Sequence, residues 1–167
     1  MTRLLLLVLL FVGIPQTFSA EWIEIGTCDY SITNQSGVNY RLSNDLSCGE
    51  RSLTAISVTN SQNIVIDFNG HSIESKVANE WFGLDIYLST HIVVTNSVAG
   101  SSPSKIEGSY YNAGMRLYKS NHISIKYLVF RGLGYGIDVY DSDENTMEKI
   151  DVVGTNGRLE MGIRTHR

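Results

Sequence analysis

Two sets of charged and aromatic residues recur along the chain at a constant offset of two positions. The first set alternates between acids and bases and consists of Asp85, Arg116, Asp138 and Arg164. The second set consists of Tyr87, Tyr118, Tyr140 and His166. If both sets lie on one face of a sheet, carboxylates and guanidinium groups run beside a line of rings. Sugars bind on aromatic faces, and arginine forks suit the carboxylates of uronic acids, so we expect this face to bind a polysaccharide or cell-surface glycan.

The same residues also have a purely structural explanation. Tyrosine is favoured in strands, and opposite charges on neighbouring strands stabilise a sheet without a ligand. Residue types alone leave both explanations open, namely a glycan-binding face and an ordinary sheet surface.

Four acidic residues crowd one short segment, and they are Asp138, Asp141, Asp143 and Glu144. Clustered carboxylate oxygens suit calcium, but no fixed calcium-loop spacing is present, and a solvated acidic turn is the simpler expectation. A glycoside hydrolase needs two carboxylates a set distance apart, for which Asp138 and Asp141 are the available pair. We therefore expect no cofactor, keep calcium as an alternative, and assign no catalytic residue.

The elements that position these residues are short units that repeat along the chain. Each unit begins with a small residue, and the five starting residues are Ala55, Gly83, Gly114, Gly136 and Gly162. An apolar, a polar and an apolar residue follow in the first four units. Six positions after the start, these four units carry a serine, at Ser61, Ser89, Ser120 and Ser142. The starts lie 28, 31, 22 and 26 residues apart, which indicates one structural unit per repeat.

Each unit holds two short segments of alternating apolar and polar residues on either side of the serine, a pattern typical of strands with one buried face. A unit this thin cannot bury its own apolar face, so units must stack into parallel sheets with about 4.8 Å between strands. The expected inward columns are Ile56, Leu84, Met115, Ile137 and Ile163, then Val58, Ile86, Leu117 and Val139. The predicted fold is an all-β, right-handed parallel β-helix of four to five coils. A polymer lying across the coils would meet one outward ring about every 4.8 Å.

The histidines, at positions 71, 91, 122 and 166, show no metal-ligand spacing. His91 and His122 occupy the same repeat position, so we expect them to stack one coil apart, with a shared metal as the less favoured alternative. The segment Asn69-Gly70-His71 is typical of a turn in which Gly70 has a positive φ.

The segment from Tyr40 to Cys48, followed by Asn63 to Ile73, resembles the opening of pectate-lyase-like β-helix repeat proteins. Later units such as Gly136-Ile137-Asp138-Val139-Tyr140-Asp141-Ser142 are similar to the generic repeat of that superfamily. The resemblance covers about residues 40–167 and implies the fold. It leaves activity open, because the superfamily holds lyases, hydrolases, epimerases, adhesins and non-enzymes. The Asn-Thr-Asp and Gly-His-Gly signatures of its pectin hydrolases do not occur in this sequence.

The N-terminal residues predict export. Arg3 precedes an apolar run from Leu4 to Ile14 that is too short to span a bilayer, and Pro15 and small residues follow it. Cleavage after Ser19 is expected, with cleavage after Ala20 as the alternative. In an exported chain the two cysteines, Cys28 and Cys48, are expected to form a disulfide rather than stay as free thiols.

The expected organisation is a signal peptide over residues 1–19, an N-terminal cap with the disulfide over 20–50, and β-helix repeats over 51–167. Further C-terminal coils or a partner subunit are expected to cover the last coil. Removal of the signal peptide takes away Arg3 and leaves a net charge of −5, which argues against a nucleic-acid partner. We expect a secreted protein, extracellular or periplasmic, that binds glycan and is either a lyase or hydrolase or a non-catalytic surface module.

Overall fold

The computed structural model describes residues 21–49, 51–76, 80–98, 103–109, 112–154 and 161–166. Within these ranges every regular element is a β-strand. The described residues include no helix with the length and apolar character needed to cross a bilayer. The expected signal peptide lies outside them.

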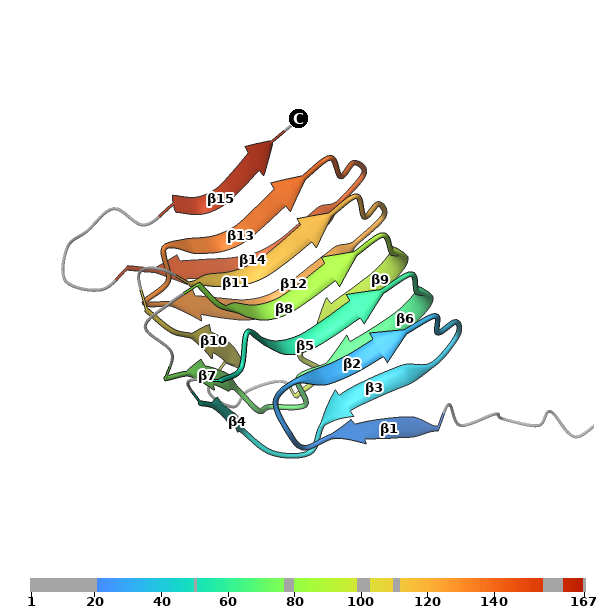
Figure 1. The fold of residues 1–167 in the computed structure, drawn as a ribbon, viewed down its shortest axis with the longest axis horizontal. Helices are drawn as coiled ribbons and strands as arrows, with labels where there is room; N and C mark the ends of the chain where they lie inside the picture. Colours follow the sequence, from blue (N-terminus) through green and yellow to red (C-terminus); the bar gives the residue numbers. More distant parts are fainter. Residues whose placement is uncertain are drawn as a thin grey trace, which may run out of the picture.

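The strands form two parallel sheets (Figure 1). The six-stranded sheet contains, in spatial order, β2 (Tyr30–Thr33), β5 (Thr54–Thr59), β8 (Phe82–Tyr87), β11 (Ala113–Tyr118), β13 (Tyr135–Tyr140) and β15 (Met161–His166). The nine-stranded sheet has two rows. One row contains β1 (Trp22–Ile25), β3 (Asn39–Leu42), β6 (Gln62–Asp67), β9 (Thr90–Thr95), β12 (Ser124–Arg131) and β14 (Thr146–Val153). The other contains β4 (Leu46–Cys48), β7 (Ile73–Ser75) and β10 (Lys105–Glu107).

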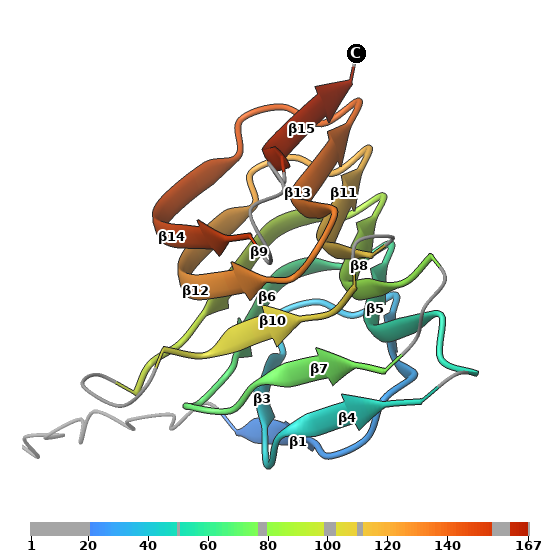
Figure 2. The same ribbon diagram turned by 90° about the vertical axis from the view of Figure 1, so that its left-hand side faces the viewer.

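The two rows join at β12, a long strand that pairs with β9 near its start and with β10 near its end. Figure 2 shows the strands of the second row, β4, β7 and β10, stacked one above another. The chain passes from the six-stranded sheet to the rows behind it and rises one level per circuit, in a right-handed sense (Figure 1). The predicted parallel β-helix is confirmed, with about five turns.

The register of the six-stranded sheet agrees with the repeat alignment. Met115 pairs with Leu84 on one side and with Ile137 on the other, and Leu117 pairs with Ile86 and Val139. These inward side chains are fully or almost fully buried. Ile163, the last member of its column, is 48 % exposed because β15 is the edge strand of this sheet among the described residues.

The second and third repeats begin with glycine because the opposite wall of the solenoid leaves no room for a side chain there. A Cβ atom on Gly83 would lie 2.5 Å from Cγ2 of Ile106, and one on Gly114 would lie 2.2 Å from Cδ1 of Phe130. Such distances are far shorter than ordinary van der Waals contact. The glycines therefore allow the larger side chains across the core to fill the interior.

The serines form a hydrogen-bonded ladder at the bend between the two sheets. The backbone N–H groups of Ser61, Ser89 and Ser120 each donate to the hydroxyl oxygen of the serine one coil further on, at 3.1, 3.1 and 2.9 Å. Each hydroxyl donates in turn to the carbonyl oxygen two residues earlier in its own coil, as from Ser89 to Tyr87 at 2.9 Å. Because backbone groups at the bend would otherwise be buried without partners, this ladder explains the repeated serine.

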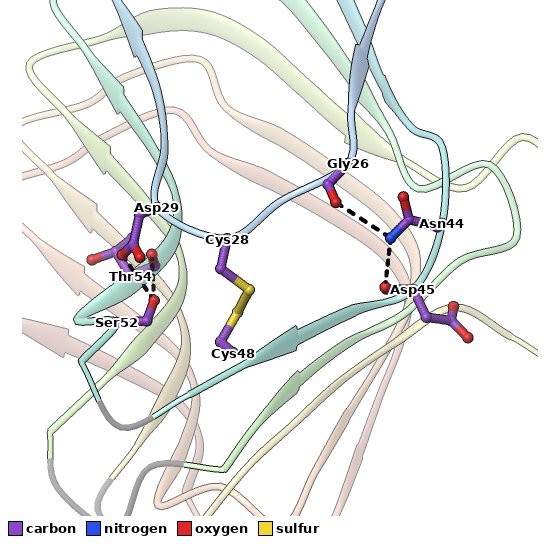
Figure 3. Close-up of a disulfide and its surroundings, with 8 residues drawn as sticks. All are labelled: Gly26, Cys28, Asp29, Asn44, Asp45, Cys48, Ser52 and Thr54. Carbon is purple, nitrogen blue, oxygen red and sulfur yellow. Dashed lines mark hydrogen bonds between the residues drawn. A yellow bond between two sulfur atoms is a disulfide. The ribbon is translucent and has the colours of Figure 1, made fainter.

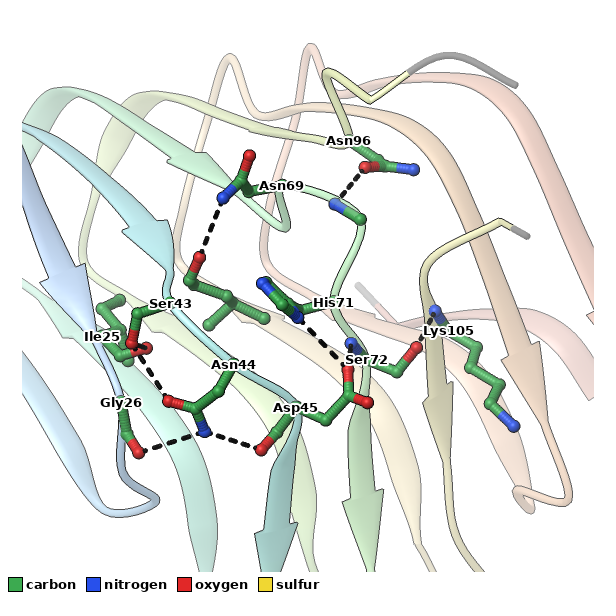
Figure 4. Close-up of polar contacts among 12 residues, drawn as sticks. Ile25, Gly26, Ser43, Asn44, Asp45, Asn69, His71, Ser72, Asn96 and Lys105 are labelled. Carbon is green, nitrogen blue, oxygen red and sulfur yellow. Dashed lines mark hydrogen bonds and ion pairs between the residues drawn. The ribbon is translucent and has the colours of Figure 1, made fainter. Parts of the chain in front are cut away.

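A second polar bend lies between the two rows of the nine-stranded sheet (Figure 4). Gly70 has a φ of 82°, which confirms the predicted turn, and its N–H group donates to the side chain of Asn96 at 2.8 Å. One coil earlier, Asp45 accepts from the N–H group of Ser72 at 2.8 Å, and its carboxylate lies 3.5 Å from Nδ1 of His71.

The first coil begins within the segment expected to form a cap. β2, β3 and β4 pair in parallel with β5, β6 and β7, so coil stacking starts before residue 51. The disulfide between Cys28 and Cys48 is present and joins the bend before β2 to the end of β4 (Figure 3). Beside it, the hydroxyl of Ser52 donates to the carboxylate of Asp29 at 2.9 Å.

Candidate functional site

The eight residues singled out from the sequence lie together on the outer face of the six-stranded sheet. We call the first set the charge column and the second set the ring column. In the charge column Arg116 pairs in register with Asp85 and Asp138, and Asp138 pairs with Arg164. The ring column stacks in the same way, in the order Tyr87, Tyr118, Tyr140 and His166.

The charge column is organised as two bidentate ion pairs. Arg116 donates from Nε to Oδ1 of Asp85 at 2.8 Å and from Nη2 to Oδ2 at 2.6 Å. Arg164 makes the same two contacts with Asp138. Its Nε donates to Oδ1 at 2.8 Å, and its Nη2 donates to Oδ2. Asp138 is only 3 % exposed, and besides its pair with Arg164 its carboxylate lies 3.6 Å from Nε2 of His166. Charge-assisted, two-point contacts of this kind fix both partners in place.

Each of these arginines also covers an aromatic ring on the neighbouring strand. The guanidinium carbon of Arg116 lies 4.0 Å from the centroid of the Phe82 ring, and that of Arg164 lies 3.6 Å from the Tyr135 ring. Arg164 further donates to the Tyr140 hydroxyl at 3.1 Å. The same combination of aspartate, arginine and ring therefore occurs twice, two strands apart, with cation–π attraction added to each ion pair.

The ring column stacks upon itself. The rings of Tyr87 and Tyr118 are 5.2 Å apart and 8° from parallel, and those of Tyr140 and His166 are 4.1 Å apart and 3° from parallel. Tyr118 and Tyr140 are tilted by 38° at 6.2 Å. Because the stacked rings turn their faces to one another, a ligand meets their edges and hydroxyl groups. The expectation that a polymer stacks on one ring face per coil therefore does not fit this geometry.

A pocket of about 180 Å³ lies between the two aspartate–arginine–ring combinations. Its lining consists of Glu80, Phe82, Ala113, Arg116, Tyr118, Tyr135, Asp138, Tyr140 and Arg164. Ala113 occupies the column position that holds Phe82 on β8 and Tyr135 on β13. The short side chain of Ala113 leaves a space where a third ring would stand, and this space is the pocket floor.

The ion pairs and burial also shift ionisation at the pocket. The hydrogen bonds to Asp85 raise the pKa of Arg116, and those to Asp138 raise the pKa of Arg164, so both stay charged. Burial raises the pKa of Tyr140, and the nearby negative charge of Asp138 adds to this rise. At neutral pH the Tyr140 hydroxyl therefore stays protonated beside the ion pair of Asp138 and Arg164.

The carboxylates considered for hydrolysis and for calcium binding, Asp138, Asp141 and Glu144, have separate surroundings. Asp138 is held by Arg164 on the sheet face, whereas Asp141 sits exposed at the bend with a φ of 44°. Glu144 forms an ion pair with Nε2 of His122. Among the described residues, no group of three or more His, Cys, Asp or Glu side chains is placed to hold a metal ion.

His91 and His122 stack as predicted, with ring centroids 4.6 Å apart and planes 11° from parallel. The nitrogen lone pairs lie in the ring planes, so those of two nearly parallel rings do not converge on one point. Nδ1 of His91 is 3.0 Å from the hydroxyl of Thr90. The pair fits a stacked surface contact better than a shared metal site.

Sequence reasoning missed four lining residues, namely Glu80, Phe82, Ala113 and Tyr135. The last three belong to one outward column, which the repeat alignment contains at the position directly before each starting glycine. The signal was the break in that column, where a small residue stands between two aromatic ones.

No protein-family model matches the chain, and no curated protein matches it in sequence. The fold and the geometry of this face are therefore the basis for any functional conclusion.

Proposed function

We propose that this chain is a secreted, non-catalytic β-helix module that binds a neutral sugar unit in the pocket above Ala113. The observation that carries the proposal is the pocket itself, in which the short side chain of Ala113 lies between Phe82 and Tyr135 on the neighbouring strands. The tyrosine hydroxyls of Tyr118 and Tyr140 border it and are suited to sugar hydroxyl groups. A shallow hollow with an apolar floor and a few convergent polar groups is typical of small-ligand sites.

The charges of the pocket favour a neutral ligand over a uronate. Both arginine forks are occupied by aspartates, so a ligand carboxylate would have to displace Asp85 or Asp138. Glu80 also lines the pocket, and the lining carries no excess positive charge. A carboxylate on the ligand would lose its hydration without finding an unpaired cation in the pocket.

The same contacts argue for binding without hydrolysis. A general acid must exchange a proton with the leaving group, but Asp85 and Asp138 are each held by two arginine hydrogen bonds. The guanidinium groups of Arg116 and Arg164 engage both oxygen atoms of these carboxylates. We therefore assign these residues to positioning rather than to proton transfer.

Export is supported by the signal-like residues 1–19 and by the disulfide, which is typical of oxidising compartments. The resemblance to pectate-lyase-like repeat proteins supports carbohydrate as the ligand class, since many members of that superfamily act on glycans.

A rigid surface or adhesion module is the second candidate. It is favoured by two features of this face that need no ligand: the tyrosine rings stack on one another, and the arginines are paired with aspartates. The two candidates differ in whether the pocket has an occupant.

A glycan array decides between them. The array presents neutral and uronate-containing oligosaccharides to the wild type and to an Ala113→Phe variant, in which a ring fills the pocket floor. We expect the wild type to bind neutral glycans and the variant to lose this signal at least tenfold. Thr54→Phe is the matched control, because Thr54 belongs to the same outward column but lies outside the pocket. No neutral glycan bound by the wild type, or equal binding by Ala113→Phe, would leave the rigid module as the better account.

A further inference from the structure

A separate site lies at the bend of the first coil, where the sequence Asn34-Gln35-Ser36 follows β2. All three residues are exposed. The triplet is an acceptor sequence for N-linked glycan, and such sequences are modified only on accessible surface loops of exported chains. The triplet therefore meets the requirement that the acceptor lie on an accessible surface.

The backbone at this bend is fixed, while the acceptor side chain is unengaged. The N–H group of Asn34 donates to the carbonyl oxygen of Thr59 at 3.0 Å, and that of Gln35 donates to the hydroxyl of Ser61 at 3.1 Å. In the described part of the chain, no hydrogen bond involves the side-chain amide of Asn34. The side chain of Asn34 is therefore exposed and not engaged by described residues, while its backbone is held in place.

The surface beside Asn34 offers a place for the first sugars. A shallow depression of about 340 Å³ runs along the bend and includes Asn34, Asn60 and Leu88, which occupy the same position in three successive coils. Leu88 is 44 % exposed, so part of this depression is apolar. Apolar sugar faces pack well on such a surface, and polar neighbours can bond their hydroxyl groups.

From these observations we infer that Asn34 is an N-glycosylation site and that its glycan lies along the bend toward Leu88. In the reaction the side-chain nitrogen of Asn34 bonds to the anomeric carbon of a lipid-linked oligosaccharide diphosphate, and the bond from that carbon to the diphosphate oxygen breaks. The lipid diphosphate leaves, and the amide loses one proton. The inference rests on the proposed export but not on the pocket, whose residues come from other coils.

The test is translation of the full chain in the presence of endoplasmic-reticulum microsomes, followed by gel analysis of the protease-protected product. We expect one upward mobility shift that an endoglycosidase reverses. Asn34→Gln and Ser36→Ala should abolish the shift, and Ser36→Thr, which keeps the acceptor sequence, should retain it.

A protected chain without the shift would overturn the inference, as would a shift that survives Ser36→Ala. A chain that stays outside the microsomes would overturn it too, because the modification requires export. None of these results bears on the pocket, because the acceptor variants leave the outer face of β8, β11, β13 and β15 unchanged.

Discussion

Arg116 and Arg164 each hold one aspartate through two hydrogen bonds and cover one ring of the adjacent strand. The sheet register places these arginines beside their aspartates, and the two-point hydrogen bonds then fix the side chains in one orientation. Ion pairs on exposed surfaces contribute little, but two-point geometry and near-complete burial of Asp138 make this pair matter for the shape of the pocket.

The serine bend between the two sheets requires a left-handed backbone conformation at one position in each coil. The position directly before each ladder serine has a positive φ, with 49° at Asn60, 49° at Leu88 and 49° at Lys119. Asparagine adopts this left-handed conformation readily, whereas a leucine side chain is strained there.

Leu88→Asn should therefore stabilise the protein by about 1 kcal/mol, because it removes this strain and an exposed apolar side chain. Leu53→Asn is the control: Leu53 is 72 % exposed but is absent from the positive-φ positions. Urea unfolding of both variants measures the effect. A Leu88→Asn midpoint equal to or below that of the wild type would contradict the strain assigned to the bend.

At the scale of the strand, the small residue that begins each repeat sets how closely the two walls approach. Gly114 and Gly162 occupy the same repeat position, and neither has a positive φ. A Cβ atom on Gly114 would lie 2.2 Å from Phe130 and 2.7 Å from the carbonyl oxygen of Gly136, whereas the nearest atom to one on Gly162 is 3.7 Å away.

Gly114→Ala should lower the free energy of unfolding by about 1–3 kcal/mol, since the added methyl forces the Phe130 ring and the backbone of β13 to move. Gly162→Ala should change it by less than about 0.5 kcal/mol. Thermal or urea unfolding compares the pair. Equal losses would show that the two positions are equally crowded and that the packing described for this column is wrong.

The strands of the six-stranded sheet and their register followed from the sequence because alternation and the serine spacing recur in the first four units. The ladder columns at Leu84, Met115 and Ile137 were predictable for the same reason. The short strands β4, β7 and β10 were not predicted, because each unit was expected to hold two strands. The pocket was not, because it depends on side-chain directions that register leaves open: which face each tyrosine presents, and whether Arg116 turns to Asp85 or to solvent. Ala113 was overlooked because the break in the aromatic column falls at the position before each starting glycine, whereas the predicted columns all follow that glycine.

At the scale of the molecule, the first coil is tied to itself by the disulfide between Cys28 and Cys48. The bond closes a loop across 20 positions, and such a loop restricts the unfolded chain. The described residues form one apolar core that runs from Ile25 to Val139 and includes Cys48. The disulfide therefore stabilises the first coil of a stack that apolar packing already holds together.

Reduction should lower the free energy of unfolding by about 3 kcal/mol. Unfolding with and without a reductant measures this difference, and the Cys28→Ala/Cys48→Ala double variant should not respond to the reductant. Equal stability of the oxidised and fully reduced wild type, with thiol titration verifying reduction, would contradict a stabilising role.

The most direct test of the proposed sugar pocket is a titration of protein labelled with ¹³C at alanine methyl groups. The Ala113 methyl forms the pocket floor, and the Ala55 methyl is buried in the core, so one spectrum contains both a probe and its control. A neutral oligosaccharide selected on the array should shift the Ala113 signal in a saturable manner and leave the Ala55 signal in place. A matched uronate oligosaccharide should bind at least tenfold more weakly. Saturable binding of the neutral sugar with an unmoved Ala113 methyl, or tighter binding of the uronate, would contradict the pocket assigned to this face.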